Sequence, residues 1–270
     1  RNATYLSELF LTNAALSGTI PILPRSILRL ELANNNLEAW GTPASAIRPY
    51  PSLDQVQLSW NRLKSLPRHF LTASEINMSH NELQGTLTAD FLTLTIGHLD
   101  LSFNNLTGTL PTRTSPNLGL HTLLLQHNQF IGTVPPEFAL MSNLMTLNLA
   151  YNNFTGNLTG WNFAVHSTII GLQLDVSNNF LSGQLADLDA NHRLESLKLA
   201  HNGLTGSIPR LPISIHTIDF SHNKLEILDS LCVATTCPSL ASIDLSHNRL
   251  QGGLVKEYLK YPRILNLKDN

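Results

Sequence analysis

The sequence predicts an α/β solenoid: a curved, right-handed superhelix with a parallel β-sheet on its concave face and irregular or 3₁₀ returns on its convex face. Three observations predict this fold. A motif recurs every 20 to 27 residues, its leucines alternate with other residues, and an asparagine follows them at a fixed place. A self-similar period in this range is typical of solenoids, because a unit of that size can bury its apolar face only against its neighbours.

The repeat is clearest in residues 120–143, LHTLLLQHNQFIGTVPPEFALMSN. Its frame is Leu-x-x-Leu-x-Leu-x-x-Asn-x-Leu-x-Gly-x-Ile/Leu-Pro. The asparagine of the frame recurs as Asn35, Asn61, Asn81, Asn104, Asn128, Asn152, Asn179, Asn202, Asn223, Asn248 and Asn270. A weaker first copy begins at Leu6, with Ala14 in place of the asparagine. We therefore expect eleven full units and the opening of a twelfth.

Each part of the unit has a physical role. The Leu-x-Leu alternation has period two, which predicts a short strand whose leucines point into the core. Parallel strands about 4.8 Å apart then bury these leucines between neighbouring units. The asparagine stands where the chain turns off the strand. Because its amide both donates and accepts, a stacked column of asparagines can satisfy backbone groups that lose water. The glycines are expected in the turn after each strand, where φ can be positive.

The repeat resembles the leucine-rich repeat superfamily along the chain from Leu6 to Asn270. Within it, the Gly-x-Ile-Pro element is similar to the plant-type, extracellular subclass found in receptor ectodomains and polygalacturonase inhibitors. This element stands at residues 18–21, 108–111, 132–135 and 206–209. The units at Asn35, Asn61 and Asn223 lack the glycine and are closer to shorter repeat types.

The resemblance implies one solenoid domain over residues 1–270, an extracellular or cell-surface location, and no cofactor. Because residue 1 is arginine, we expect this solenoid to be part of a longer chain. Only 13% of residues are charged and the formal net charge is −2, which argues against a nucleic-acid or anionic-membrane surface. No stretch approaches 18 consecutive apolar residues, so no transmembrane segment is expected in this portion.

The two cysteines, Cys232 and Cys237, lie in the insertion LCVATTCPSL. We expect them to form a small disulfide loop in an oxidising compartment. The alternative is two unpaired thiols, one of them packed in the core. Two cysteines are too few for a zinc site.

Five Asn-x-Ser/Thr sequons are candidates for N-glycosylation. They stand at Asn2, Asn77, Asn105, Asn153 and Asn157. If the protein is secreted, as its repeat class implies, we expect several of them to carry glycans. Asn77 falls on the concave face, where a glycan would cover the N-terminal half of that surface.

The residues immediately before the repeated asparagines are the main candidates for ligand binding. Along the chain this column reads Asn34, Trp60, His80, Phe103, His127, Tyr151, Asn178, His201, His222 and His247. The strongest candidates are Trp60, Phe103, His127 and Tyr151. Aromatic side chains on a rigid concave wall offer a large contact area at little entropic cost. The alternative is that these rings only pack on neighbouring columns.

The C-terminal part of the same surface combines histidines with aspartates. The candidates there are His201, His222, His247, Asp219 and Asp244. Stacked imidazoles can share a cation, or repel one another once protonated near about pH 6. The alternative is that Ser-His-Asn merely fills the repeat frame, and we predict no metal site. A hydrolase triad is not predicted either, because these residues recur along a flat ladder without a nucleophile elbow or oxyanion donors.

The sequence therefore predicts a non-enzymatic extracellular recognition module, such as a receptor or adhesion ectodomain, that binds a protein, peptide or glycan. The alternative is structural: a glycosylated subunit of a cell-surface coat, wall or fibre that self-associates through open solenoid ends. Residues 264–270 form the strand of a new unit, and a solenoid that stops there exposes an unpaired parallel edge. An enzyme is the least favoured reading.

Overall fold

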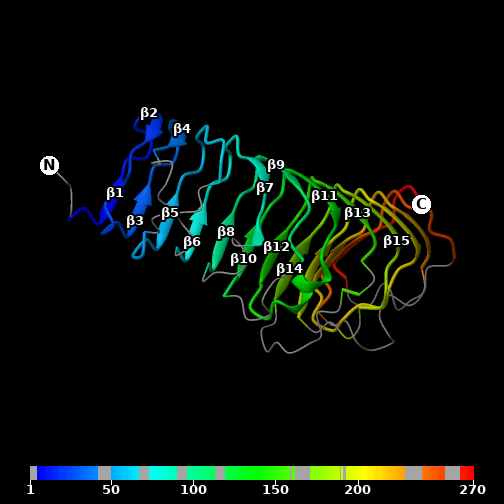
Figure 1. Ribbon diagram of the computed structural model, residues 1–270. Helices are drawn as coiled ribbons and strands as arrows, with labels where there is room; N and C mark the ends of the chain where they lie inside the picture. The colour runs from blue at the N-terminus through cyan, green and yellow to red at the C-terminus, as the bar shows by residue number, and fades with distance from the viewer. Residues whose placement is uncertain are drawn as a thin grey trace.

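The computed structural model confirms the predicted curved solenoid (Figure 1). It describes residues 5–41, 50–66, 73–89, 96–112, 119–158, 160–161, 171–188, 190, 193–228, 239–252 and 262–270. The chain winds from the blue N-terminal end to the red C-terminal end without doubling back. Cys232, Cys237 and the sequon at Asn2 lie outside the described residues.

The concave sheet has twelve short parallel strands, which pair in chain order, and it forms the wall that carries the predicted site. They are β1 (Glu8–Phe10), β3 (Arg29–Glu31), β5 (Gln55–Gln57), β6 (Glu75–Asn77), β8 (His98–Asp100), β10 (Thr122–Leu124), β12 (Thr146–Asn148), β14 (Leu172–Asp175), β16 (Leu194–Lys198), β18 (Thr217–Asp219), β20 (Ser242–Asp244) and β21 (Ile264–Asn266). Equivalent residues of successive units lie side by side, as Thr122 does with Thr146 and Leu123 with Leu147. Columns read from the sequence are therefore columns in space.

A second parallel sheet, not predicted from the sequence, follows the turn that leaves the concave strands. Its seven strands are β7 (Gln84–Thr86), β9 (Asn105–Gly108), β11 (Gln129–Thr133), β13 (Asn153–Gly156), β15 (Phe180–Gln184), β17 (Gly203–Ser207) and β19 (Lys224–Ile227). Near the N-terminus, β2 (Ser17–Ile20) and β4 (Asn36–Trp40) pair in the same way. The described return segments include the 3₁₀ helix η3 (Pro136–Leu140).

The repeat glycines lie in this second sheet, so the expectation that they serve the turn after each concave strand was wrong. Gly108 and Gly132 have φ of +82° and +81°, which glycine adopts without steric cost. A Cβ on Gly132 would lie 2.8 Å from the Thr109 methyl carbon of the preceding unit. Glycine therefore lets each outer strand sit directly against the side chain of its neighbour.

The core is the stack of leucines that the period-two alternation predicts. Leu123 and Leu125 are completely buried, and so are their counterparts Leu147 and Leu149 in the next unit. The phenylalanine of the second sheet, Phe130, is also fully buried. Each unit thus buries its apolar face between its two neighbours.

The predicted asparagine ladder is confirmed in all eleven units. Asn128 shows the pattern: its Nδ2 donates to the carbonyl of Leu101 in the preceding unit (2.9 Å) and to that of Leu125 in its own unit (3.1 Å). Its Oδ1 accepts from the backbone N–H of Leu106, again in the preceding unit (3.0 Å). The asparagines therefore satisfy buried backbone groups and also bind each unit to the one before it.

No helix among the described residues is long and apolar enough to cross a membrane.

Candidate functional site

The candidate column lies in the turn that leaves the concave strands, and every residue in it has a left-handed backbone. The φ angles of the ten predicted positions fall between +52° and +57°. This conformation costs a residue other than glycine roughly 1 to 2 kcal/mol. The backbone ladder continues through the turn, since the N–H of Trp60 donates to the carbonyl of Ser79 in the next unit (3.0 Å). Lateral hydrogen bonds therefore help to hold the turn in its strained form.

A side-chain hydrogen bond across the turn also supports it in most units. Asp100 Oδ1 accepts from the backbone N–H of Ser102 (2.9 Å) and from its hydroxyl (2.6 Å). Asp219 and Asp244 do the same with Ser221 and Ser246. These two aspartates, predicted as ligand-binding residues beside the histidines, thus have a structural role that already occupies one oxygen of each carboxylate.

Five consecutive rings of the column stack into a continuous series, which we call the ring ladder. Its members are Trp60, His80, Phe103, His127 and Tyr151. Neighbouring ring centroids are 3.8 to 4.2 Å apart and the ring planes differ by 9° to 17°. Burial and the neighbouring His80 lower the pKa of His127.

The ring ladder remains accessible to solvent even though its members stack. Trp60 is 56% exposed and Tyr151 is 50% exposed. The rings therefore pack on their neighbours and also present an apolar edge to solvent, and their role in ligand binding stays a prediction.

The stack is interrupted once. At Asn178 a carboxamide stands where the neighbouring units carry rings. Beyond it, His201, His222 and His247 stack again, with centroids 4.0 and 4.1 Å apart. The predicted site is therefore divided into an aromatic series and a histidine series.

The histidine series resists protonation at its centre. Burial is the largest cause that lowers the pKa of His222, and the positive charges of His201 and His247 lower it further. The carboxylates of Asp219 and Asp244 raise it, but by less. The middle imidazole is therefore neutral over a wider pH range than a free histidine.

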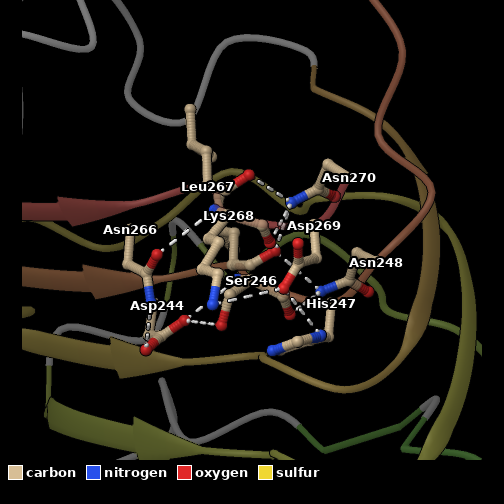
Figure 2. A network of polar contacts seen from close by, with 10 residues as sticks. Asp244, Ser246, His247, Asn248, Asn266, Leu267, Lys268, Asp269 and Asn270 are labelled. Carbon is tan, nitrogen blue, oxygen red and sulfur yellow. Dashed lines mark hydrogen bonds and ion pairs between the residues drawn. The ribbon is translucent and has the colours of Figure 1, made fainter.

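A polar network closes the C-terminal end of this series (Figure 2). His247 Nδ1 lies 3.4 Å from Asp269 Oδ2, and Asn266 Nδ2 donates to Asp244 Oδ2 (3.0 Å). Burial raises the pKa of Asp244, but the hydrogen bonds from Ser246 and Asn266 together outweigh it and lower the pKa overall. In the described part of the chain, no group of three or more His, Cys, Asp or Glu residues is arranged to hold a metal ion.

Shallow hollows lie on the concave surface formed by the described residues. One, of about 300 Å³, lies over β6, β8 and β10 and includes Asn77, His98 and Asp100. A second, of about 360 Å³, extends from Tyr151 along the histidine series to His247. The second hollow is lined by predicted site residues from Tyr151 to His247, so the surface there offers space as well as an apolar edge.

The four described sequons lie on two different surfaces. Asn77 is half-buried in β6, and its Oδ1 accepts from Ser79. Asn105 and Asn153 are exposed on the second sheet, and Asn157 is exposed just beyond β13. Glycans on the latter three would leave the concave face open.

Comparisons with known proteins identify the repeat. The family model for the leucine-rich repeat matches residues 96–115, 119–141 and 193–212. Podocan-like protein 1 of Homo sapiens is 29% identical over 261 residues, which covers 94% of this chain and 41% of that protein. The chain belongs to the leucine-rich repeat superfamily. Within this superfamily, osteomodulin of Bos taurus is 29% identical over 126 residues, covering 45% of this chain and 29% of that protein.

Solved leucine-rich repeat structures have the same fold. The plant peptide hormone receptor RGFR1, in complex with RGF2, matches with a TM-score of 0.75 and 23% identity over 92% of this chain and 40% of that one. The ectodomain of the membrane receptor kinase GASSHO1/SCHENGEN3 from Arabidopsis thaliana, in complex with Casparian strip integrity factor 2, matches with a TM-score of 0.65 and 26% identity over 91% of this chain and 33% of that one. This leucine-rich repeat chain spans between 29% and 41% of the length of these relatives.

Proposed function

We propose that this chain is a non-enzymatic extracellular recognition module that binds a peptide along the ring ladder and the concave strands beside it. The observation that carries this proposal is the ring ladder itself, five stacked rings held in a strained backbone conformation with their edges in water. Rigid aromatic side chains lose little entropy on binding and bury a large area, and such residues dominate many interfaces.

The turn does not need a ring, which argues against a purely structural role for the ladder. Asn34 and Asn178 adopt the same φ of +55° at equivalent positions with only a carboxamide. Asparagine tolerates this conformation better than an aromatic residue does. Tryptophan, phenylalanine and tyrosine are thus placed where the backbone favours another residue type, and this supports a role in binding.

The comparisons support the class of ligand and the location. A chain that resembles a peptide hormone receptor and a receptor ectodomain is a reasonable candidate to bind a peptide outside the cell. Binding of a glycan or of a folded protein, and self-association through the solenoid ends, stay predictions.

The proposal is tested by selecting linear peptides on the 270-residue chain from a displayed random library and measuring their affinity for variants. Replacing both Trp60 and Tyr151 with alanine should weaken binding at least tenfold, because each removes a half-exposed ring from the edge of the site. Ile131→Ala is the matched control, since Ile131 is equally exposed, at 50%, but lies on the second sheet. Equal affinities of the double variant and the unmodified chain would refute the proposal.

A further inference from the structure

The interruption of the ring series at Asn178 leaves a gap of a definite size. Neighbouring rings on either side of it are 4.0 to 4.2 Å apart, so Tyr151 and His201, two units apart, are separated by roughly 8 to 10 Å. A planar group between two rings needs about 3.5 to 4.0 Å on each face, or about 7 to 8 Å in total. The Asn178 carboxamide is shorter than a ring and fills only the inner part of this gap, so the outer part, beyond its tip, has room for one planar group.

Two hollows meet at this gap. The hollow of about 360 Å³ on the concave side and a second one of about 430 Å³ on the side of the second sheet share Tyr151, Asn178 and His201 in their linings. A side chain can thus enter between the two rings from the concave surface and find space beyond them.

Two polar side chains at the gap, Asn178 and Asp175, have oxygens that can accept further hydrogen bonds. Within the described residues the Asn178 carboxamide makes no hydrogen bond. Asp175 lines the same hollow and uses only Oδ1, which accepts from Ser177 (3.0 Å). Asp175 Oδ2 accepts no hydrogen bond from the residues that the structure describes. Lys198 lies beside Asp175 in the sheet, but the described residues include no ion pair between them.

We propose that this gap is a slot for one guanidinium group, the side chain of an arginine in the bound peptide. The guanidinium lies flat between the rings of Tyr151 and His201, and its N–H groups donate to Asp175 Oδ2 and to the Asn178 carbonyl oxygen. The inference rests on the proposed peptide-binding function and specifies one residue of the ligand.

Arginine fits this slot better than other side chains. Its guanidinium is planar and cationic, stacks on aromatic faces and carries several donors in one plane. A lysine ammonium has the charge but is not planar, so it leaves the space between the rings unfilled. An aromatic side chain would fill the space but leave the two oxygens at the slot without a donor.

Closing the slot tests the inference. Asn178→His inserts a ring at the missing position and should complete the stack from Trp60 to His247. Histidine already occupies the equivalent turn in five other units, with φ between +52° and +55°, so this variant should keep the fold. Asn34→His is the matched control, because it adds a ring at the equivalent position next to Trp60, remote from the slot.

The readout is the NMR signal of the Tyr151 ring, identified with Tyr151→Phe, during titration with N-acetyl-arginine methylamide. We expect a saturable shift that is at least fivefold weaker with the lysine analogue. The apparent affinity should fall at least tenfold in Asn178→His and stay unchanged in Asn34→His. Asp175→Asn is a second variant that weakens binding but keeps the turn, since Asn148 makes the same hydrogen bond.

The outcomes separate the slot from the proposed function. No shift, an equal response to lysine, or full arginine binding by Asn178→His would overturn the slot. Selected peptides that depend on Trp60 and Tyr151 but bind Asn178→His equally well would also overturn it, while leaving the proposed function intact. Arginine binding at the slot without any peptide binding would overturn the proposed peptide-binding function and leave the slot for a guanidinium intact.

Discussion

Replacing Asn128 with alanine should destabilise the solenoid by about 4 kcal/mol, because the side chain satisfies three buried backbone groups. It accepts from the N–H of Leu106 and donates to the carbonyls of Leu101 and Leu125, at 2.9 to 3.1 Å. Leaving one such group unsatisfied costs about 1 to 3 kcal/mol. Each of the two carbonyls keeps a second lone pair that can accept another hydrogen bond. The total loss of stability therefore stays near the lower end of the summed cost of the three groups.

The assay is chemical denaturation combined with hydrogen exchange. Denaturation gives the loss of stability, and exchange locates it, because the Leu106 amide loses its acceptor. Asn105→Ala is the matched control, since Asn105 is exposed on the second sheet and its loss should cost less than about 0.5 kcal/mol.

Two results would refute the reasoning. A loss below about 1 kcal/mol for Asn128→Ala would mean that water replaces the amide at little cost. Unchanged protection of the Leu106 amide would mean that its hydrogen bond to Asn128 is not what shields it.

Two further predictions follow from the backbone and the histidines. Gly132→Ala should destabilise the fold by about 2 kcal/mol, because it combines a positive φ with a Cβ 2.8 Å from the Thr109 methyl carbon. The control is Gly119→Ala, whose Cβ would meet open space and which should leave the thermal melt nearly unchanged. The lowered pKa of His222 means that the fold prefers its neutral form, so its stabilising contribution is complete above the ordinary value of 6.5 and is lost as the pH falls below it. His222→Asn, a residue that Asn178 shows to fit this turn, should therefore reduce the drop in melting temperature between about pH 7.5 and 5; an equal drop in both proteins would contradict the assignment.

The concave strands and the asparagine ladder are predictable because each follows from one residue type at one repeated position. Leucines at i and i+2 require a strand, and an amide at the end of that strand meets the backbone groups of two units. Neither feature depends on the parts of the unit that vary, such as the returns.

The second sheet is harder to predict, because Asn105–Gly108 contains residues that usually mark turns. Its signal is the alternation of buried Leu106 with exposed Thr107 just before Gly108, a glycine that fits against the preceding unit. The left-handed turn is harder still, since aromatic residues rarely adopt positive φ. The clue there is the Asp-x-Ser pattern, as in Asp100 and Ser102, which closes the turn with a side-chain hydrogen bond.

The asparagine ladder has a consequence for how such a surface changes length. Each asparagine bonds backbone groups of its own unit and of the one before it, so a whole unit inserted between two others finds the same partners on both sides. The segments beyond the insertion move along the solenoid by one strand spacing, about 4.8 Å, and keep their internal contacts. The edge that carries the ring ladder therefore grows or shrinks in fixed steps. The position of Asn178 relative to either end of the ring series is likewise fixed as a whole number of repeat units.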